Sequence, residues 1–166
     1  MLIFDTPADF TTTLKKALTD IDPKWESYDG LIVPGSHTPN QVGEKIEAIK
    51  EFRVKRKPAL LICFGYQLGV IEYAQNVLKI RDATSEEFSD KQYWDMGKGT
   101  HVVKRRKGGL KVGEHDEQSW WSNYEVVIDW ESALSQYATP FHPEYQSSKA
   151  KPAPLLCHFL QYASTV

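Results

Sequence analysis

Three side chains of the types used in nucleophilic catalysis stand out in the sequence: Cys63, His142 and Glu144. Cys63 ends the apolar run LLIC and is followed at once by Phe-Gly-Tyr-Gln. A single proline separates His142 from Glu144 in FHPEY, a gap that lets the carboxylate fold back on the imidazole. A thiol nucleophile needs a base, and the base needs a group that fixes its tautomer. Together these residues predict a cysteine–histidine–glutamate triad.

The segments on either side of Cys63 indicate how it is positioned. Residues 59–62 are typical of a buried strand and residues 64–78 of a helix, and Gly65 permits close packing at the bend between them. Ligands gather at the carboxyl ends of parallel strands, and backbone N–H groups at a helix N-terminus favour thiolate over thiol. The alternative is a structural cysteine, because cysteine is often buried. The HPE tripeptide favours the nucleophile.

The rest of the chain supplies the elements that would hold these residues. Apolar strands are predicted at residues 1–5, 31–33, 59–62 and 137–141, and they alternate with helical patterns at residues 8–20, 44–56, 64–78 and 151–163. Strands that alternate with helices favour a mostly parallel sheet covered on both faces. We therefore expect one domain over residues 1–166 with a three-layer α/β/α architecture.

The second half of the chain contains a different pattern. Residues 93–130 contain glycines and segments with an alternating pattern, such as HVV, GLKVG and YEVVIDW. This pattern predicts antiparallel hairpins at the edge of the sheet. The basic run at residues 104–107 adjoins two glycines and has no interleaved aromatic residues. We interpret it as a solvated hairpin tip rather than a nucleic-acid site.

Composition excludes several classes of protein. The chain has 166 residues, 41% of them hydrophobic, and a formal net charge of -2, which favours neither nucleic acid nor an acidic tail. No segment is long and apolar enough to predict a membrane span, and the N-terminus lacks a signal pattern. Two cysteines, Cys63 and Cys157, fit a reducing compartment. A cytoplasmic protein without a metal or cofactor is expected.

Five motifs occur in an order and at spacings that resemble a known family. They are YDGLIVPG, ICFGYQ, VIEYAQNVL, DATSEEF and FHPEYQSS. The sequence is similar to class I (triad-type) glutamine amidotransferase domains over nearly its whole length, and most of all to the glutaminase domain of CTP synthase. The resemblance implies a flavodoxin-like fold with antiparallel edge strands and hydrolysis of the glutamine side-chain amide, with ammonia released for a separate synthase partner.

The resemblance also implies roles for individual residues. Cys63 would be the nucleophile, His142 the general base and acid, and Glu144 the carboxylate that orients His142. The oxyanion would lie between the backbone N–H of Phe64 and one in the Gly35–Ser36 turn.

The substrate would be held by a second group of residues. Gln67 and Glu87 match family positions that bind glutamine, and the Glu87 carboxylate suits an α-ammonium group. The segment SWWSNYEVV adds Trp121, Asn123 and Tyr124 as candidate substrate-binding residues.

The sequence departs from the family at two of these places. Ser36 replaces the second glycine after the proline, and Asn123 replaces the arginine that precedes the tyrosine and binds the glutamine carboxylate. Losing a bidentate partner is not a conservative change. Two substrates therefore stay open: glutamine, and another γ-glutamyl or related small amide. A catalytically inactive relative with a binding or regulatory role is a further alternative. A generic nucleotide-binding module would need a phosphate-cradling glycine loop, for which PGS at 34–36 is the weak candidate.

Overall fold

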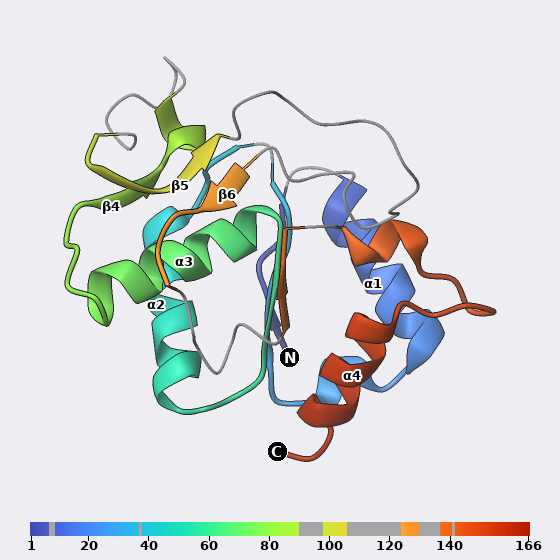
Figure 1. Ribbon diagram of the computed structural model, residues 1–166. Helices are drawn as coiled ribbons and strands as arrows, with labels where there is room; N and C mark the ends of the chain where they lie inside the picture. Colours follow the sequence, from blue (N-terminus) through green and yellow to red (C-terminus); the bar gives the residue numbers. More distant parts are fainter. Residues whose placement is uncertain (7–8, 37, 90–97, 106–123, 130–136, 141) are drawn as a thin grey trace.

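The main sheet is parallel and carries the strand order β1-β2-β3-β7 (Figure 1). The computed structural model describes residues 1–6, 9–36, 38–89, 98–105, 124–129, 137–140 and 142–166. The four strands are β1 (Leu2–Ile3), β2 (Leu31–Val33), β3 (Ala59–Ile62) and β7 (Ala138–Thr139). Every side chain of β2 and β3 is buried, as expected for parallel strands covered on both faces.

Helices cover both faces of this sheet. The helices α1 (Asp9–Ile21) and α4 (Pro154–Ala163) pack on one face, and α2 (Val42–Val54) and α3 (Phe64–Asn76) pack on the other (Figure 1).

The pleat of the strands divides the core between these two faces. Successive side chains of a strand point to opposite sides of its sheet. Leu61 accordingly joins the cluster under α2 and α3, whereas Leu60 and Ile62 join the cluster under α1 and α4. The predicted three-layer, flavodoxin-like architecture is confirmed.

The predicted elements of this layered unit lie close to the observed ones. The strand expected at residues 59–62 is β3 itself, and the helix expected at 64–78 ends two residues earlier at Asn76. The helix expected at 44–56 is α2, which begins and ends two residues earlier. These apolar periodicities were long enough to locate each element.

Three strands between residues 83 and 126 form a separate sheet, which corrects the prediction of hairpins at the edge of the main one. Its strands β4 (Ala83–Ser85), β5 (Thr100–Arg105) and β6 (Tyr124–Val126) have the order β4-β5-β6. The expected antiparallel pairing is present between β5 and β6, whereas β4 and β5 run parallel. Val102 and Val103 pack in the α2–α3 cluster, so this sheet lies over α3. The segment GLKVG lies outside the described residues, as does most of the basic run KRRKG.

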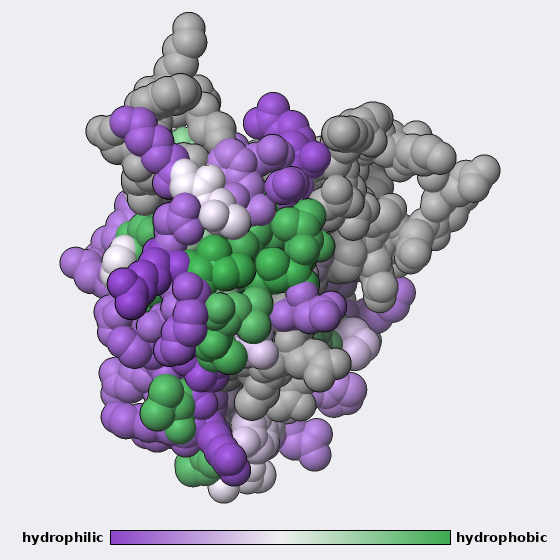
Figure 2. Space-filling view, turned by 60° about the vertical axis from the view of Figure 1, so that its left-hand side comes forward, coloured by the Kyte–Doolittle hydropathy of each residue, from purple (hydrophilic) through white to green (hydrophobic). Residues whose placement is uncertain are grey.

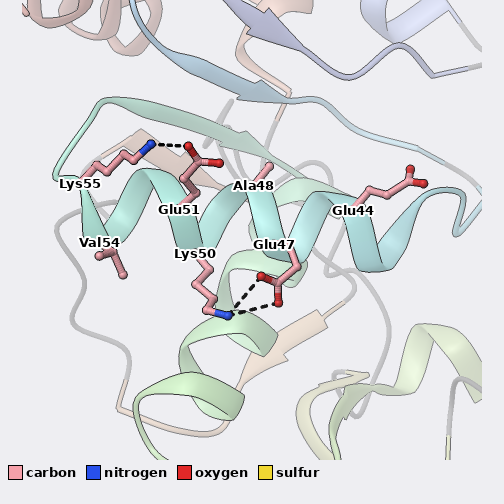
Figure 3. A pocket seen from close by; sticks show the side chains of 7 residues that line it. All are labelled: Glu44, Glu47, Ala48, Lys50, Glu51, Val54 and Lys55. Atoms are coloured by element: carbon pink, nitrogen blue, oxygen red, sulfur yellow. Dashed lines mark hydrogen bonds and ion pairs between the residues drawn. The ribbon is translucent and has the colours of Figure 1, made fainter.

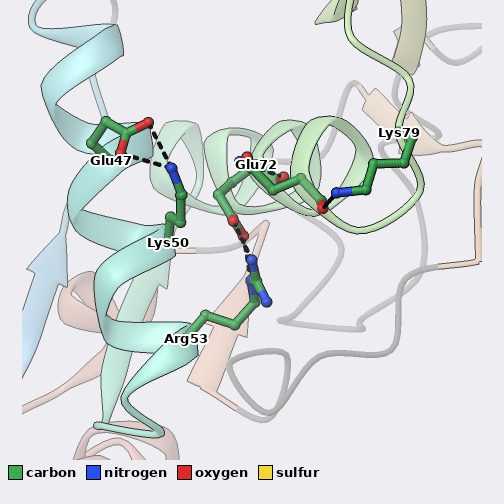
Figure 4. A network of polar contacts seen from close by, with 6 residues as sticks. Glu47, Lys50, Arg53, Glu72 and Lys79 are labelled. Carbon is green, nitrogen blue, oxygen red and sulfur yellow. Dashed lines mark hydrogen bonds and ion pairs between the residues drawn. The ribbon is translucent and has the colours of Figure 1, made fainter.

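A buried ion pair joins α2 to α3. Arg53 Nε and Nη2 donate to the two carboxylate oxygens of Glu72 at 2.8 and 2.7 Å, and the Glu72 side chain is 1% exposed (Figure 4). Bidentate pairing of this kind fixes direction as well as distance. It therefore sets how α3, the helix that begins directly after Cys63, lies against α2.

The outer surface offers a shallow pocket along α2 (Figure 3). It is lined by Glu44, Glu47, Ala48, Lys50, Glu51, Val54 and Lys55. Two pairs of its charged side chains already bind one another, Lys50 with Glu47 and Lys55 with Glu51. On the side that carries α2, α3 and the second sheet, apolar side chains are also exposed among hydrophilic ones (Figure 2). None of the described helices is long and apolar enough to cross a membrane.

Candidate active site

Cys63 occupies a strained turn between β3 and α3. Its backbone has φ 51° and ψ -101°, a conformation that residues with a side chain rarely adopt. Its N–H donates to the Thr139 carbonyl at 2.8 Å, and its own carbonyl accepts the N–H of Gln67 at 3.2 Å as α3 begins. Such strain at the end of a strand is typical of a nucleophile elbow.

Gly65 makes this turn possible. A methyl group added at Gly65 would overlap the backbone carbonyl of Val33 at the end of β2. The first turn of α3 can therefore approach the sheet only because residue 65 has no side chain. The predicted reason for this glycine, close packing at the bend, is the observed one.

His142 and Glu144 form the predicted pair just after β7. His142 Nδ1 and Glu144 Oε1 are 2.7 Å apart, and the two side chains are 4% and 0% exposed. A carboxylate can only accept, so the imidazole carries its hydrogen on Nδ1 and the neutral ring keeps a lone pair on Nε2. This is the tautomer that a general base requires.

Two aromatic rings pack against the imidazole of His142. Phe10 of α1 stacks on His142 with ring centroids 4.8 Å apart and planes 22° apart, and Tyr145 lies 5.6 Å away. Phe10 shares the spacing of Leu14 and Leu18, which is typical of the buried face of a helix, but that spacing does not show that its ring contacts His142. The contact of Phe10 with His142 was therefore missed in the sequence and is seen only in the packing of α1.

Strand pairing brings the cysteine and the histidine to the same edge. Ile62 of β3 pairs with Thr139 of β7, so Cys63 and His142 each follow the carboxyl end of one of two neighbouring parallel strands. Gly35, which follows β2, belongs to the same edge, because a methyl group added there would overlap His142 Cε1. The three strand ends thus assemble the site predicted from the sequence.

Replacing Gly35 by alanine tests this contact. The added methyl group is expected to displace the His142 ring and lower kcat about 100-fold, the effect of misplacing a catalytic group by about 1 Å. Gly43→Ala is the matched control, because a methyl group there meets nothing within 4 Å. Steady-state assays should find the control unchanged in kcat and stabilised by up to about 1 kcal/mol. Full activity in Gly35→Ala would contradict the assembly described.

The pKa of the Cys63 thiol is raised, not lowered. Burial, together with the carboxylates of Glu87 and Glu144, raises the pKa of Cys63 to about 12, and the N–H of Phe64 lowers it only in part. The N–H at the start of α3 favours the thiolate as expected, but burial outweighs its effect on the pKa of Cys63. The resting side chain is a neutral thiol, so its proton must leave during the reaction.

Gln67 and Glu87 form a connected polar group beside the cysteine. Gln67 Nε2 donates to Glu87 Oε2, and Gln67 Oε1 accepts the hydroxyl of Ser85 at 2.7 Å. The Ser85 hydroxyl also accepts the N–H of Glu87 at 3.2 Å. The resemblance implied Gln67 and Glu87 as substrate-binding residues but did not single out Ser85, which is fully buried.

Ser36 lies in the turn after β2, where a serine replaces the family's glycine. Its hydroxyl donates to the Thr38 carbonyl at 2.7 Å and accepts the Thr38 N–H at 3.2 Å. The side chain is thus engaged within its own loop. Phe64, the other residue predicted at the oxyanion, is the first residue of α3 and is buried.

The remaining candidates lie at or beyond the boundary of the described residues. Trp121 and Asn123 fall outside them, and Tyr124 is described only as the first residue of β6, opposite Arg105. Among the described residues, no group of histidine, cysteine and acidic side chains is arranged to hold a metal ion.

Comparison with known proteins identifies the class. The structure combines a flavodoxin-like α/β fold with a cysteine at a strand–helix turn and a paired histidine and glutamate. Residues 6–162 match the model of the family described as glutamine amidotransferase class-I. The chain belongs to the class I glutamine amidotransferase family.

Individual relatives point to one branch of that family. The chain is 31% identical to the CTP synthase of Methanoculleus marisnigri, over 80% of this chain and 33% of the relative. It is 30% identical to the CTP synthase of Pyrococcus abyssi, over 78% of this chain and 33% of that protein. The chain therefore spans about a third of the length of these relatives.

A solved structure shares the fold. It is described as the glutaminase domain of Trypanosoma brucei CTPS with bound acivicin. The TM-score is 0.68, with 17% sequence identity over 99% of this chain and 94% of that one. At this identity the likeness concerns the fold alone.

Proposed function

We propose that this chain hydrolyses the side-chain amide of glutamine with Cys63 as nucleophile. The observation that carries the proposal is the contact between His142 and Glu144 at the strand end next to the strained turn of Cys63, in a chain of the class I amidotransferase family. The wide similarity to CTP synthases favours glutamine as the amide.

The first half-reaction forms a thioester. His142 accepts the thiol proton as the Cys63 sulfur attacks the amide carbon, and the developing oxyanion is stabilised by the backbone N–H of Phe64 and one in the Gly35–Ser36 turn. His142 then gives that proton to the departing nitrogen, and ammonia leaves. Glu144 fixes the ring and stabilises the imidazolium while it exists.

The second half-reaction regenerates the enzyme. A water molecule loses a proton to His142 and attacks the thioester carbon, the carbon–sulfur bond breaks, and glutamate leaves as the sulfur regains a proton. We further propose that the ammonia is passed to a synthase, since the similar curated proteins are CTP synthases.

The test combines turnover with labelling. The purified chain is incubated with glutamine, and the glutamate and ammonia that form are measured. We expect the two products in equal amounts. Acivicin, the compound bound in the similar T. brucei domain, is then used to label the chain, and the modified residue is located by mass spectrometry. We expect Cys63 to be labelled and free glutamine to protect it. Labelling of Cys157 alone would count against the proposal.

A second amide is kept as a candidate because of Asn123. This residue stands where the family carries an arginine for the substrate carboxylate. Assaying a panel of γ-glutamyl amides beside glutamine separates the candidates. A higher kcat/KM for an amide with a neutral or aromatic end would replace glutamine as the substrate.

Replacing Glu87 by glutamine tests its proposed role with the substrate ammonium. The change keeps an acceptor for Gln67 but removes the charge, so kcat/KM for glutamine should fall about 10- to 100-fold. The same change lowers the pKa of Cys63, because the Glu87 charge is one cause of its rise. Iodoacetamide should therefore alkylate Cys63 several-fold faster at pH 8 while turnover falls.

The neighbouring Glu86→Gln is the control for this experiment. Glu86 accepts the backbone N–H of Arg105 and is not among the causes of the Cys63 shift. Both rates should stay near those of the unchanged protein. If Glu87→Gln slowed alkylation as well as turnover, the electrostatic role of Glu87 would have to be abandoned.

A further inference from the structure

A buried lysine lies beside the candidate active site without a part in the chemistry described so far. Lys45, in the first turns of α2, is fully buried, although lysine is almost never so buried unless it is paired. Lys45 lies four residues before Ile49 and seven before Phe52, so it shares the buried face of α2 with them. Its residue type alone would assign it to the surface.

The ammonium group of Lys45 is held by one loop residue and two rings. Nζ donates to the backbone carbonyl and to the side-chain Oδ1 of Asn40, both at 2.9 Å. It also lies 5.9 Å from the centre of the Phe4 ring and 5.6 Å from that of Phe64, within range of cation–π attraction.

These contacts join the two segments that are proposed to supply the oxyanion donors. One is the loop after Ser36, in which the Ser36 hydroxyl binds Thr38 and the Asn40 N–H donates to the Thr38 carbonyl at 2.9 Å. The other is Phe64, the residue directly after the cysteine. A single buried cation therefore contacts the loop that follows one proposed donor and the side chain of the residue that supplies the other.

We propose that Lys45 is a positioning residue, whose buried charge ties the loop after Ser36 to Phe64 and so sets the spacing of the two oxyanion donors. This inference rests on the proposed amide hydrolysis. Oxyanion donors act through their placement, so a small shift in that spacing affects the transition state more than the bound substrate. The expected signature is a loss in kcat with little change in KM.

The charge of Lys45 is adjustable, which gives a second readout. Burial lowers the pKa of Lys45 to about 8, opposed by the neighbouring carboxylate of Glu44. The groups that face it from the loop, from the segment after β1 and from α3 are Asn40, Phe4 and Phe64, which carry no charge. Above pH 8 the amine loses its charge-assisted hydrogen bonds and its cation–π contacts.

The experiment compares Lys45→Met with Lys45→Arg, and uses Lys50→Met on the exposed side of the same helix as the control. With glutamine, Lys45→Met should lower kcat roughly 10- to 100-fold and change KM less than threefold. Lys45→Arg should keep more activity and move the alkaline limb of kcat to higher pH. Lys50→Met should change neither quantity.

Stability measured across the same pH range separates positioning from a purely structural role. Because the pKa of Lys45 lies below its unfolded value, the unfolded chain binds more protons between about pH 8 and 10.5, and folding gains stability there as pH rises. Relative to Lys45→Met, the unchanged protein should thus become more stable over this range while its kcat falls. A kcat that rises and falls with the thermal midpoint would reduce Lys45 to a structural residue.

The two proposals fail in different ways. If the unchanged protein turns over glutamine and Lys45→Met does so within twofold, the role of Lys45 is rejected and the amide hydrolysis stands. If the unchanged protein releases no ammonia from glutamine or from the γ-glutamyl panel, the proposed function is rejected and this inference with it.

Discussion

Replacement of Cys63 by alanine is expected to abolish ammonia release from glutamine, lowering kcat by at least about four orders of magnitude. No other side chain at this edge of the sheet is a thiol, and neither water nor His142 can take its place in forming a thioester. Coupled detection of ammonia, with a detection limit low enough to measure a 10⁴-fold loss, makes the measurement.

The chain supplies its own control for this variant. Cys157 lies on α4 and is also a free, half-buried thiol, so Cys157→Ala should retain full turnover. A Cys63→Ala protein with more than a hundredth of the unchanged kcat would leave the nucleophile unassigned.

The strained backbone of Cys63 adds a result about stability. At φ 51° both cysteine and alanine are strained, whereas glycine adopts this conformation freely. Cys63→Gly should therefore be inactive and yet more stable than Cys63→Ala, by about 1 kcal/mol in chemical unfolding. Equal stability of the two variants would mean that the turn relaxes in the absence of the thiol.

Replacement of Glu144 by glutamine is expected to lower kcat about 10³- to 10⁴-fold, because the amide reverses the hydrogen bond to His142. The amide NH₂ can donate to Nδ1, which moves the imidazole hydrogen to Nε2 and removes the lone pair that would accept the thiol proton. Substrate binding does not depend on this hydrogen, so KM should change far less than kcat.

The pH dependence of alkylation gives an independent reading of the same variant. The negative charge of Glu144 is one cause of the raised pKa of Cys63. In Glu144→Gln this pKa should be lower, and the rate of iodoacetamide modification of Cys63 should rise at lower pH than in the unchanged protein. The exposed Glu26→Gln serves as control, with both profiles unchanged. A Glu144→Gln kcat within tenfold of normal would exclude the triad.

The sequence predicted the layered unit well because its signals are local. Four-residue apolar runs and 3.6-residue periodicity depend on neighbours in the chain, and they located β3 and α3 closely. The second sheet could not be placed in this way. Its strand β4 contains Ala83, Thr84 and Ser85, which carry little apolar signal, and its pairing with β5 is set by contacts with α3.

The candidate site was predicted in its residues but not in its electrostatics. Motif order identified Cys63, His142 and Glu144, and the short contact between the last two needs only the two-residue spacing. The raised pKa of Cys63 depends on burial and on Glu87, which is 24 residues along the chain and reaches the site through the fold. Phe10 and Lys45 were not singled out, because helical spacing places both on buried faces but does not show which side chains they contact there.

The backbone hydrogen bond from Cys63 to Thr139 makes the position of the proposed nucleophile depend on a very short strand, β7. β7 has two residues and lies at one edge of the described part of the main sheet, opposite β1. Short edge elements open at lower free energy than a core strand such as β3. Fraying of β7 would separate His142 from Cys63 in one step, so we expect heat inactivation to precede the melting of the helices.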